Sequence, residues 1–440
     1  MTDRSRVAAI RFGLGPRLGE ALPADPLPWL EAQIARPAPP PAGPTVQEAL
    51  RLRAEQLAMR TVATAEAPPG MATAAPPNRG PLTEMMRAEN LAWAQRRLTA
   101  EQPFRERLVD FWMNHFTVSR RSGNAAPLVG AMERDAIRPH LTGRFVDMLL
   151  AATRHPAMLL YLDNHVSVGP GSRFGQRARR GLNENLAREV LELHTLSPAG
   201  GYTQGDVTEF AKVLTGLSVD LNTEPFDFVW RAERHEPGDK TVLGRRVEEG
   251  EEGVVAALRM LGTHPATWRH LAVKLARHFV ADDPPPEAVR ALAEVLRRTE
   301  GDLGATYRVL VGLPGAWTPL AKFRTPMDFA IAAVRATGAV ERPELVLSGM
   351  IALGQPLWTA PQPNGWSDRA GDWAGPEALM RRVDWAYTLS GRVARPDIAA
   401  VTEAALGPFA RAETVATMRG AGSVRDALTV LFSSPEFMHR

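Results

Sequence analysis

The chain has 440 residues, of which 45% are hydrophobic and 23% are charged, and these values are typical of a globular protein with a packed core. Its 52 basic and 49 acidic residues give a net charge of +3, an excess too small to indicate a nucleic-acid-binding surface. It contains no cysteine, which excludes disulfides, cysteine nucleophiles and thiolate metal sites.

The first 82 residues predict short helices joined by proline-rich linkers. Residues 36–44 and 66–82 are rich in Pro, Ala and Gly, and proline blocks helix interiors. We therefore expect an N-terminal unit of residues 1–82 ahead of a main helical domain of residues 83–440. No apolar stretch reaches the ~18 residues that span a bilayer, and no secretory signal follows Met1. A cytoplasmic location is the default expectation, and periplasmic export by an unusual route stays open.

Most of the chain shows apolar residues at helical spacing, interrupted by short Gly, Pro and Asp breaks. Helices are expected at about residues 4–19, 26–35, 45–62, 83–101, 103–120, 126–136, 143–153, 181–197, 203–217, 251–260, 264–280, 285–299, 302–312, 325–337, 342–353, 376–392, 396–407, 410–418 and 423–436. Strands are expected at 226–231 and 240–247, with a turn at residues 236–239 between them. The sequence predicts an all-α fold, a large bundle-like domain with a small β-hairpin insertion near residues 226–247.

The most informative helix spans Asn183–Thr195. Its apolar side chains cluster on one arc, and Glu189 falls inside that arc, with Asn185 and Glu192 at the edge. A buried carboxylate is costly unless it is paired, protonated or bound to a metal. Glu189 and Glu192 are therefore candidate metal ligands or a general acid–base pair. In the alternative interpretation, Glu189 forms a salt bridge with a buried arginine and only supports the fold.

A second polar face of the same helix carries Glu184, Arg188 and Thr195, a spacing that allows an internal ion pair. Arg188 is also a candidate site residue, as is His194 in the last turn. The next helix has a capping-box-like start, because Thr203 stands three residues before Asp206.

A second candidate segment is the helix that ends near His115. On this helix His115 shares an arc with Phe111, whereas Asp110 and Asn114 lie together on another face. A lone histidine on an apolar face is more often a core residue than a ligand. The alternative is a site built between facing helices, in which His115 joins the two glutamates of the main helix. The Glu-x-x-His pairs of ferritin-like di-iron centres are missing, so that type of centre is not expected.

Only four of the 52 basic residues are lysines, and the rest are arginines. A lysine retained against such a bias can stand where a compact charge or a titratable amine is needed. The alternative is that these lysines have no special role. They are Lys212, Lys240, Lys274 and Lys322.

Two loops offer binding surfaces. The segment before the main helix carries arginines at 173, 177, 179 and 180, which predicts either a solvated loop or a contact with an anion or a partner. Trp358, Trp366 and Trp373 surround the turn at Pro363–Gly365, and they either line a substrate groove or pack over a helix. The sequence lacks the Gly-x-Ser-x-Gly, Walker, dinucleotide-binding and His-Glu-x-x-His motifs, which argues against the enzyme classes that carry them.

Several phrases resemble a bacterial family known as domain of unknown function 1800. They are Phe111–Phe116, Tyr161–Asn164, Leu182–Leu196, Gly201–Val207, Leu214–Gly216, His264–Pro265, Lys274–Val280, Lys322–Pro326 and Ser434–Phe437. The resemblance covers nearly the whole chain and implies a bacterial, mainly helical protein with a possible partner, an alkaline-phosphatase-like protein encoded nearby. The chain departs from the family pattern at Ser197–Pro198 and in its short loop at residues 167–180, both beside the main helix. The resemblance implies no activity.

Two functional hypotheses follow. In the first, the protein is an enzyme, a metal-dependent hydrolase or oxidoreductase or an acid–base catalyst, with Glu189, Glu192 and His115 around a divalent metal or a proton-transfer site. Carboxylate and imidazole ligands suit Mg²⁺, Mn²⁺ or Fe²⁺. Asn114, Asn185 and Lys212 would orient the substrate. In the second, the protein is a non-catalytic assembly or maturation partner that binds another protein through its Trp-rich and Arg-rich loops.

Overall fold

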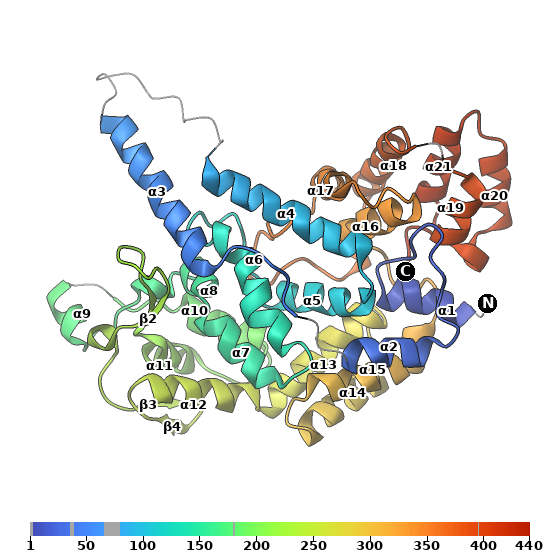
Figure 1. The fold of residues 1–440 in the computed structure, drawn as a ribbon. Coiled ribbons are helices and arrows are strands. Elements are labelled where there is room, and N and C mark those ends of the chain that lie inside the picture. Colours follow the sequence, from blue (N-terminus) through green and yellow to red (C-terminus); the bar gives the residue numbers. More distant parts are fainter. Residues whose placement is uncertain (1–2, 36–38, 66–79, 179–180, 395) are drawn as a thin grey trace.

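The computed structural model describes residues 3–35, 39–65, 80–178, 181–394 and 396–440 (Figure 1). These residues form twenty-one α-helices, ten short 3₁₀ or π segments and two antiparallel two-stranded sheets. The predicted all-α fold with a small β insertion is therefore confirmed. Most of the predicted linker at 66–82 and part of that at 36–44 lie outside the described residues, as do Arg179 and Arg180.

The α-helices are α1 (Asp3–Val7), α2 (Pro26–Ala35), α3 (Val46–Ala65), α4 (Pro81–Thr99), α5 (Pro103–His115), α6 (Val129–Met132), α7 (Phe145–Arg154), α8 (Pro156–Tyr161), α9 (Arg173–Ala178), α10 (Asn185–Glu189), α11 (Gln204–Leu214), α12 (Glu251–Gly262), α13 (Pro265–Phe279), α14 (Pro286–Arg298), α15 (Leu303–Gly312), α16 (Pro326–Ala336), α17 (Pro343–Ala352), α18 (Pro376–Ser390), α19 (Ile398–Ala405), α20 (Ala412–Arg419) and α21 (Val424–Ser433). The π segments are η1 (Ala8–Phe12), η3 (Glu133–Ile137) and η6 (Val190–His194).

Apolar side chains form two cores. The first core gathers buried residues from the region 7–317, and the second combines residues 323–438 with Leu14 and the C-terminal half of α4. Figure 1 shows the second group, α16 to α21, as a lobe at one side of the molecule, with α4 reaching it from the first. Helix α2, from the predicted N-terminal unit of residues 1–82, packs against α5 and α15 in the first core. The apolar side chains thus divide near residue 320.

Side-chain caps explain where the helices around the cavity begin. The Oγ1 atom of Thr325 accepts a hydrogen bond from the Asp328 amide at 3.2 Å, and Pro326 follows in the first helical position of α16. The His264 side chain likewise accepts a hydrogen bond from the Ala266 amide at the start of α13, and Pro265 occupies the first helical position. The predicted capping box of α11 is confirmed by reciprocal hydrogen bonds between Thr203 and Asp206.

The β insertion has a different pairing from the predicted one. Strand β2 (Phe228–Trp230) pairs with β1 (Leu217–Val219), and β3 (Lys240–Val242) pairs with β4 (Arg245–Val247). The prediction that 226–231 and 240–247 form one hairpin is therefore wrong. The second segment is a hairpin by itself, because Leu243 and Gly244 both have positive φ, at 52° and 70°, as a two-residue hairpin turn requires.

The predicted main helix is confirmed, with one change of geometry. It begins as α10 and continues from Val190 to His194 as the π segment η6. A π segment contains an extra residue per turn, so it rotates the side chains that follow it. His194 and Thr195 are consequently buried, while Glu192 remains partly exposed.

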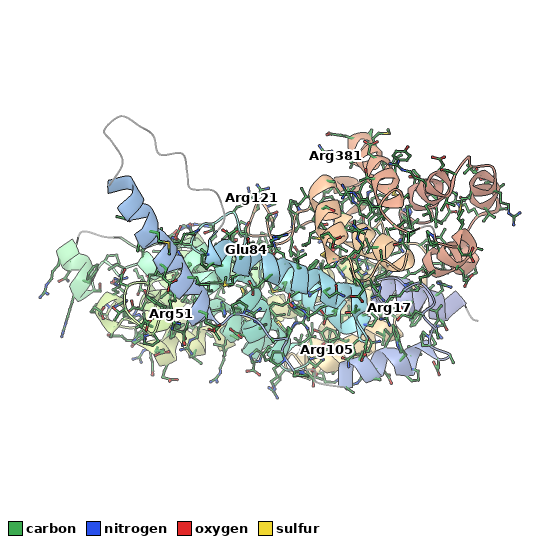
Figure 2. The ribbon with its side chains drawn as sticks, turned by 45° about the horizontal axis from the view of Figure 1, so that its top comes forward. Arg17, Arg51, Glu84, Arg105, Arg121 and Arg381 are labelled. Atoms are coloured by element: carbon green, nitrogen blue, oxygen red, sulfur yellow. The ribbon has the colours of Figure 1, made fainter. Side chains whose placement is uncertain are left out.

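A buried set of charges, which we call the Arg97 network, ties α4 and α5 to η3. Arg97 is fully buried and lies 2.5 Å from Asp110 and 3.2 Å from Glu133. Its other members are Arg96, Glu106 and Arg138. Arg51 and Arg381, which are labelled in Figure 2, project instead from the surface. No helix among the described residues is long and apolar enough to cross a membrane.

Candidate active site

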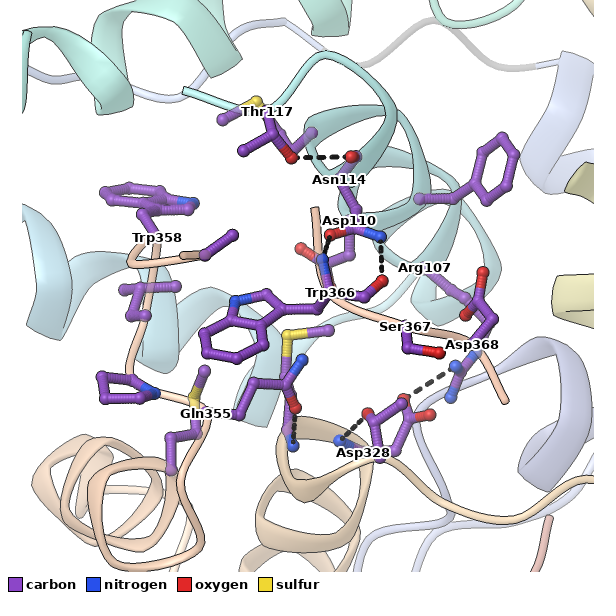
Figure 3. Close-up of a pocket in the computed structure, with 18 of the residues that line it drawn as sticks. Arg107, Asp110, Asn114, Thr117, Asp328, Gln355, Trp358, Trp366, Ser367 and Asp368 are labelled. Carbon is purple, nitrogen blue, oxygen red and sulfur yellow. Dashed lines mark hydrogen bonds and ion pairs between the residues drawn. The ribbon is translucent and has the colours of Figure 1, made fainter. Parts of the chain in front are cut away.

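A cavity of about 810 Å³, a value that includes space open to solvent, lies where the two cores meet. Helices α4, α5, α13, α16 and α17 and the loop of residues 353–369 surround it (Figure 3). Its apolar lining includes Trp93, Phe111, Met113, Met327, Met350, Leu357, Trp358 and Trp366, and its polar lining includes Arg107, Asp110, Asn114, His278, Gln355 and Asp368. An apolar chamber with few polar groups is the usual form of a small-molecule site.

Asn114 holds the tryptophan loop against α5. Its side-chain amide donates to the Trp366 carbonyl at 2.8 Å, and its Oδ1 accepts from the Trp366 amide at 2.7 Å. Gly365 has φ +78°, and a Cβ there would stand 2.5 Å from the Asn114 carbonyl oxygen. In Figure 3, Trp366 lies between Trp358 and α5. Asn114 thus positions an aromatic wall of the cavity, and its role in orienting a ligand stays a prediction.

Trp358 forms another part of this wall. The Arg120 amide donates to its carbonyl at 2.7 Å, and the Arg120 guanidinium lies 4.6 Å from the centre of the indole ring. Gln355 fixes the start of the same loop by accepting a hydrogen bond from the Met327 amide at 2.8 Å. The loop is therefore attached to α5 and α16 by specific contacts.

The polar end of the cavity contains a His–Asp pair. The Nδ1 atom of His278 lies 2.7 Å from Oδ1 of Asp368, while its Nε2 atom is buried without a hydrogen-bond partner among the described residues. Burial lowers the pKa of His278 below its ordinary value, against the opposing effect of Asp368. The imidazole is therefore neutral near pH 7, with a proton on Nδ1 and a free lone pair on Nε2.

Asp368 is held in its ionised form. Burial opposes its charge, but His278, Lys322 and Arg440 together lower its pKa to about 2. Lys322 also donates to the Asp368 carbonyl at 2.7 Å and forms an ion pair with Asp282. The carboxylate can thus orient the His278 ring and stabilise it when it becomes protonated.

Two further carboxylates line the cavity, and both are paired. Asp328 lies 2.8 Å from Arg107 and 3.0 Å from Arg440, and these arginines hold its pKa below the ordinary range despite burial. Asp110 belongs to the Arg97 network. Burial, with repulsion from the other carboxylates of that network, raises the pKa of Asp110 to about 6 against the attraction of Arg97.

The predicted candidate His115 lies next to the cavity in a group that we call the histidine cluster: His115, His194 and His270. The rings of His115 and His194 are 5.9 Å apart, and those of His115 and His270 are 6.3 Å apart. Their Nε2 contacts are with backbone carbonyls, from His115 to His194 and from His270 to Leu193. Burial lowers the pKa of His194 to about 3 and that of His270 to about 4, with a further contribution from Lys274. His115 and His194 are thus neighbours, whereas the sequence predicted Glu189 and Glu192 beside His115.

Glu189 and Glu192 lie apart from the histidine cluster. The charges that act on His115 are those of Lys274, His194 and His270, whereas Glu189 is influenced by Glu192 and Arg188. Burial and Glu192 raise the pKa of Glu189, which has no ion pair or hydrogen bond within the described part of the chain. Glu192 interacts with Tyr202. The described residues contain no group of three or more His, Asp or Glu side chains arranged to hold a metal ion, so the three predicted ligands are not gathered here.

Arg188, Asn185 and Lys212 are partly or fully exposed, whereas Thr195 is buried. Arg188 forms the predicted i,i+4 ion pair with Glu184 at 3.2 Å, whereas Thr195 instead donates to the Val190 carbonyl. Asn185 is exposed, and Lys212 forms an ion pair with Glu209 at 2.6 Å. None of these residues is among those that line the cavity.

Sequence reasoning did not single out His278 or Asp368. His278 stands eight residues after His270 and four after Lys274, so one face of α13 carries three titratable side chains in a row. That spacing was a usable signal. Asp368 had none, because it lies 90 residues further along in an irregular loop.

Comparison with known proteins gives a family. The sequence model described as "Protein of unknown function (DUF1800)" matches residues 7–439, nearly the whole chain. The protein belongs to this family. The predicted resemblance is therefore confirmed. No curated protein and no solved structure matches the chain. The cavity, the His–Asp pair and the histidine cluster all lie within the matched residues.

Proposed function

We propose that this member of the DUF1800 family is an enzyme whose active site is the tryptophan-lined cavity, with His278 as a general base. The observation that carries the proposal is the His278–Asp368 pair, in which one ring nitrogen is held at 2.7 Å by a carboxylate and the other is buried without a partner. A buried polar atom without a partner is unfavourable, and such atoms in native proteins often mark sites that bind a ligand.

The pair can move a proton in a defined direction. The His278 Nε2 lone pair accepts a proton from a substrate or from water, and the imidazolium that forms keeps its Nδ1 hydrogen bond to ionised Asp368. A base with a lowered pKa remains unprotonated, and thus available, at neutral pH. The same histidine then returns the proton to a leaving group.

The walls of the cavity favour a small substrate with a flat or apolar part. Trp358, Trp366 and Phe111 offer ring surfaces, and the Asn114 contacts hold Trp366 in place before any ligand binds. Pre-organisation of this type lowers the entropic cost of binding. Because the chain has no cysteine and Ser367 donates its hydroxyl to Asp372, the group that His278 activates is water or the substrate itself.

Nitrobenzisoxazole tests the proposal. This aromatic compound opens its ring when a base removes one proton, so it reports a base in an apolar cavity without knowledge of the natural substrate. We expect the wild-type protein to open it at least ~100-fold faster than free imidazole at equal concentration, the lower end of the contribution of positioned acid–base groups. The kcat profile should fall on the acid side at a pH below 6.5, following the lowered pKa of His278.

His278→Gln should abolish this rate, Asp368→Asn should reduce it, and Trp366→Ala should mainly raise KM. His140→Gln is the control, because His140 is also partly buried but lies in the η4 segment (Arg138–His140), outside the cavity lining. A wild-type rate equal to that of free imidazole, or an equal rate in His278→Gln, would show that the cavity holds no general base.

Two hypotheses from the sequence differ from this proposal, namely a metal site on the main helix and a non-catalytic binding role. The hypothesis of an oxygen-rich Mg²⁺, Mn²⁺ or Fe²⁺ site at Glu189, Glu192 and His115 stays a prediction, and elemental analysis of protein purified without chelator tests it. The alternative of a non-catalytic partner, with an alkaline-phosphatase-like protein as its target, also stays a prediction. It draws less support from the tryptophan loop, because Trp358 and Trp366 line the cavity.

A further inference from the structure

The four lysines of the chain have four different environments. Lys212 pairs with Glu209, Lys322 pairs with Asp282, and Lys240 donates to the Glu236 carbonyl and contacts His235. Lys274 differs from all three. No described residue forms a hydrogen bond or an ion pair with its ammonium group.

Lys274 lies in the middle of the titratable face of α13. His270, Lys274 and His278 are spaced by four residues, so they follow one another along one side of the helix. Opposite them on α5, His115 lies 6.3 Å from His270, and Phe111 lies 5.3 Å from His278, ring centre to ring centre. The two helices therefore run in opposite directions, and Lys274 stands between the histidine cluster and the His278–Asp368 pair.

The groups facing Lys274 do not neutralise a positive charge. Asp368 attracts it from beyond ion-pair distance, and Arg277 on the same helix repels it. The side chains of the histidine cluster, from α5, η6 and α13, are kept neutral by burial and by Lys274 itself. A desolvated ammonium without a counter-ion is costly, and the usual outcome is loss of its proton. Burial lowers the pKa of Lys274 to about 8, and the residue as a whole remains partly exposed.

We propose that Lys274 is a nucleophilic amine that captures an aldehyde or ketone as an imine. Its lone pair forms a bond to the carbonyl carbon, both nitrogen protons leave with the carbonyl oxygen as water, and no oxidant or reductant is needed. A lysine made neutral by its surroundings is suited to this chemistry. The reactivity of Lys274 stands on its own contacts, whereas the assignment of a carbonyl substrate to the cavity rests on the proposed function.

Within that proposed function, His278 lies one helical turn from Lys274. Once the imine nitrogen takes up a proton from water, the compound becomes acidic at the adjacent carbon, because the iminium accepts the electron pair that the departing proton leaves behind. His278 would remove that proton at Nε2, with Asp368 stabilising the imidazolium. The substrate class is thus a small aldehyde or ketone with a removable proton beside the carbonyl group.

Imine trapping on the full-length protein tests the proposal. The protein is treated with benzaldehyde and sodium cyanoborohydride at pH 7.5, and each lysine is quantified by peptide mapping. We expect Lys274 to be labelled at least ~10-fold faster than Lys212, because its lowered pKa leaves a substantial part of the Lys274 amine neutral at this pH. The rate at Lys274 should level off above pH 8, where most of its amine is already neutral. Any chain-terminal amine is resolved as a separate peptide.

Lys212 is the matched control, because its side chain is 30% exposed and its ammonium group is paired with Glu209. Lys274→Arg keeps the positive charge and should lose the label, with Lys212 labelled as before. Faster labelling of Lys212 than of Lys274 would overturn the proposal.

Labelling of His278→Gln separates the two proposals. If Lys274 stays reactive while the nitrobenzisoxazole rate is lost, both hold. If Lys274 is inert in the wild-type protein while that protein still opens nitrobenzisoxazole, the proposal of a nucleophilic Lys274 fails and the proposal of a general base stands.

Discussion

The Arg97 network and the titratable face of α13 lie on different sides of α5. They differ in whether their buried polar groups have partners of opposite charge or hydrogen-bond partners. In the network, each charged side chain lies close to at least one of opposite sign. Arg97, for example, contacts three carboxylates, those of Asp110, Glu106 and Glu133. On the α13 side, the Nδ1 atoms of His115 and His194, the Nε2 atom of His278 and the ammonium of Lys274 lack such partners among the described residues. Paired charges support the fold, whereas unpaired titratable groups beside a cavity are the ones available for chemistry.

The largest expected effect comes from breaking the network. Arg97→Met leaves three carboxylates near one another without their shared counter-charge, and we expect the free energy of unfolding to fall by ~3–5 kcal/mol. Urea denaturation at pH 7.5 measures it. Arg87→Met is the control, because its pair with Glu84 is exposed and 3.8 Å long, and it should change stability by no more than ~0.5 kcal/mol. A loss below ~1 kcal/mol for Arg97→Met would show that the network does not support the fold.

The second effect depends on pH and concerns the histidine cluster. The pKa of His194 is about 3 in the folded protein and near 6.5 in an unfolded chain, so the unfolded chain binds more protons between these values. The contribution of neutral His194 to the free energy of unfolding is therefore complete above pH 6.5, and it is lost as the pH falls toward 3. At pH 5 this loss amounts to ~2 kcal/mol for His194 alone.

His194→Phe should therefore reduce the difference in unfolding free energy between pH 7.5 and pH 5 by ~2 kcal/mol. Urea denaturation at the two pH values measures this difference. Phe145→Leu is a non-titrating control in the same packing region, and its cost should be equal at both pH values. An unchanged pH dependence in His194→Phe would mean that His194 titrates normally.

The smallest expected effect is a gain in stability, in contrast to the loss expected for Arg97→Met. Lys274 loses its proton near pH 8 in the folded protein but near 10.5 when unfolded, so between these values stability rises with pH, and below pH 8 the wild type carries a penalty. Lys274→Met removes this penalty, and because Lys274 is partly exposed only part of it, ~1 kcal/mol, should appear as added stability at pH 7, with little gain at pH 10. Thermal unfolding at the two pH values checks this.

Lys212→Met, with its partly exposed ion pair, should show no such gain. If Lys274→Met instead cost more than ~1 kcal/mol at pH 7, Lys274 would be a paired structural cation, and the contrast with the Arg97 network would disappear.

Predictions from the sequence were most successful for features that depend only on residues close together in the chain. The helices, the capping box at Thr203 and the Glu184–Arg188 pair follow from spacing within a few residues. The pairing of the two strands near 226–247 failed, because the partner of β2 is β1, which no alternating pattern revealed. For the site, the helix that ends at His115 contacts the main helix through His194, which the sequence did not predict, whereas Glu189 was expected deeper than its half-buried position.

The sequence by itself determined the helical fold, the absence of thiol chemistry and the row of His270, Lys274 and His278 along one helix, because periodicity and composition are properties of neighbouring residues. Only the tertiary structure decided which polar groups found partners. Asp368 reaches His278 across 90 residues, and Arg440 reaches Asp328 from the other end of the second core. Whether a buried charge is neutralised depends on such distant contacts, and that separates the Arg97 network, which supports the fold, from the face of α13 on which we place the chemistry.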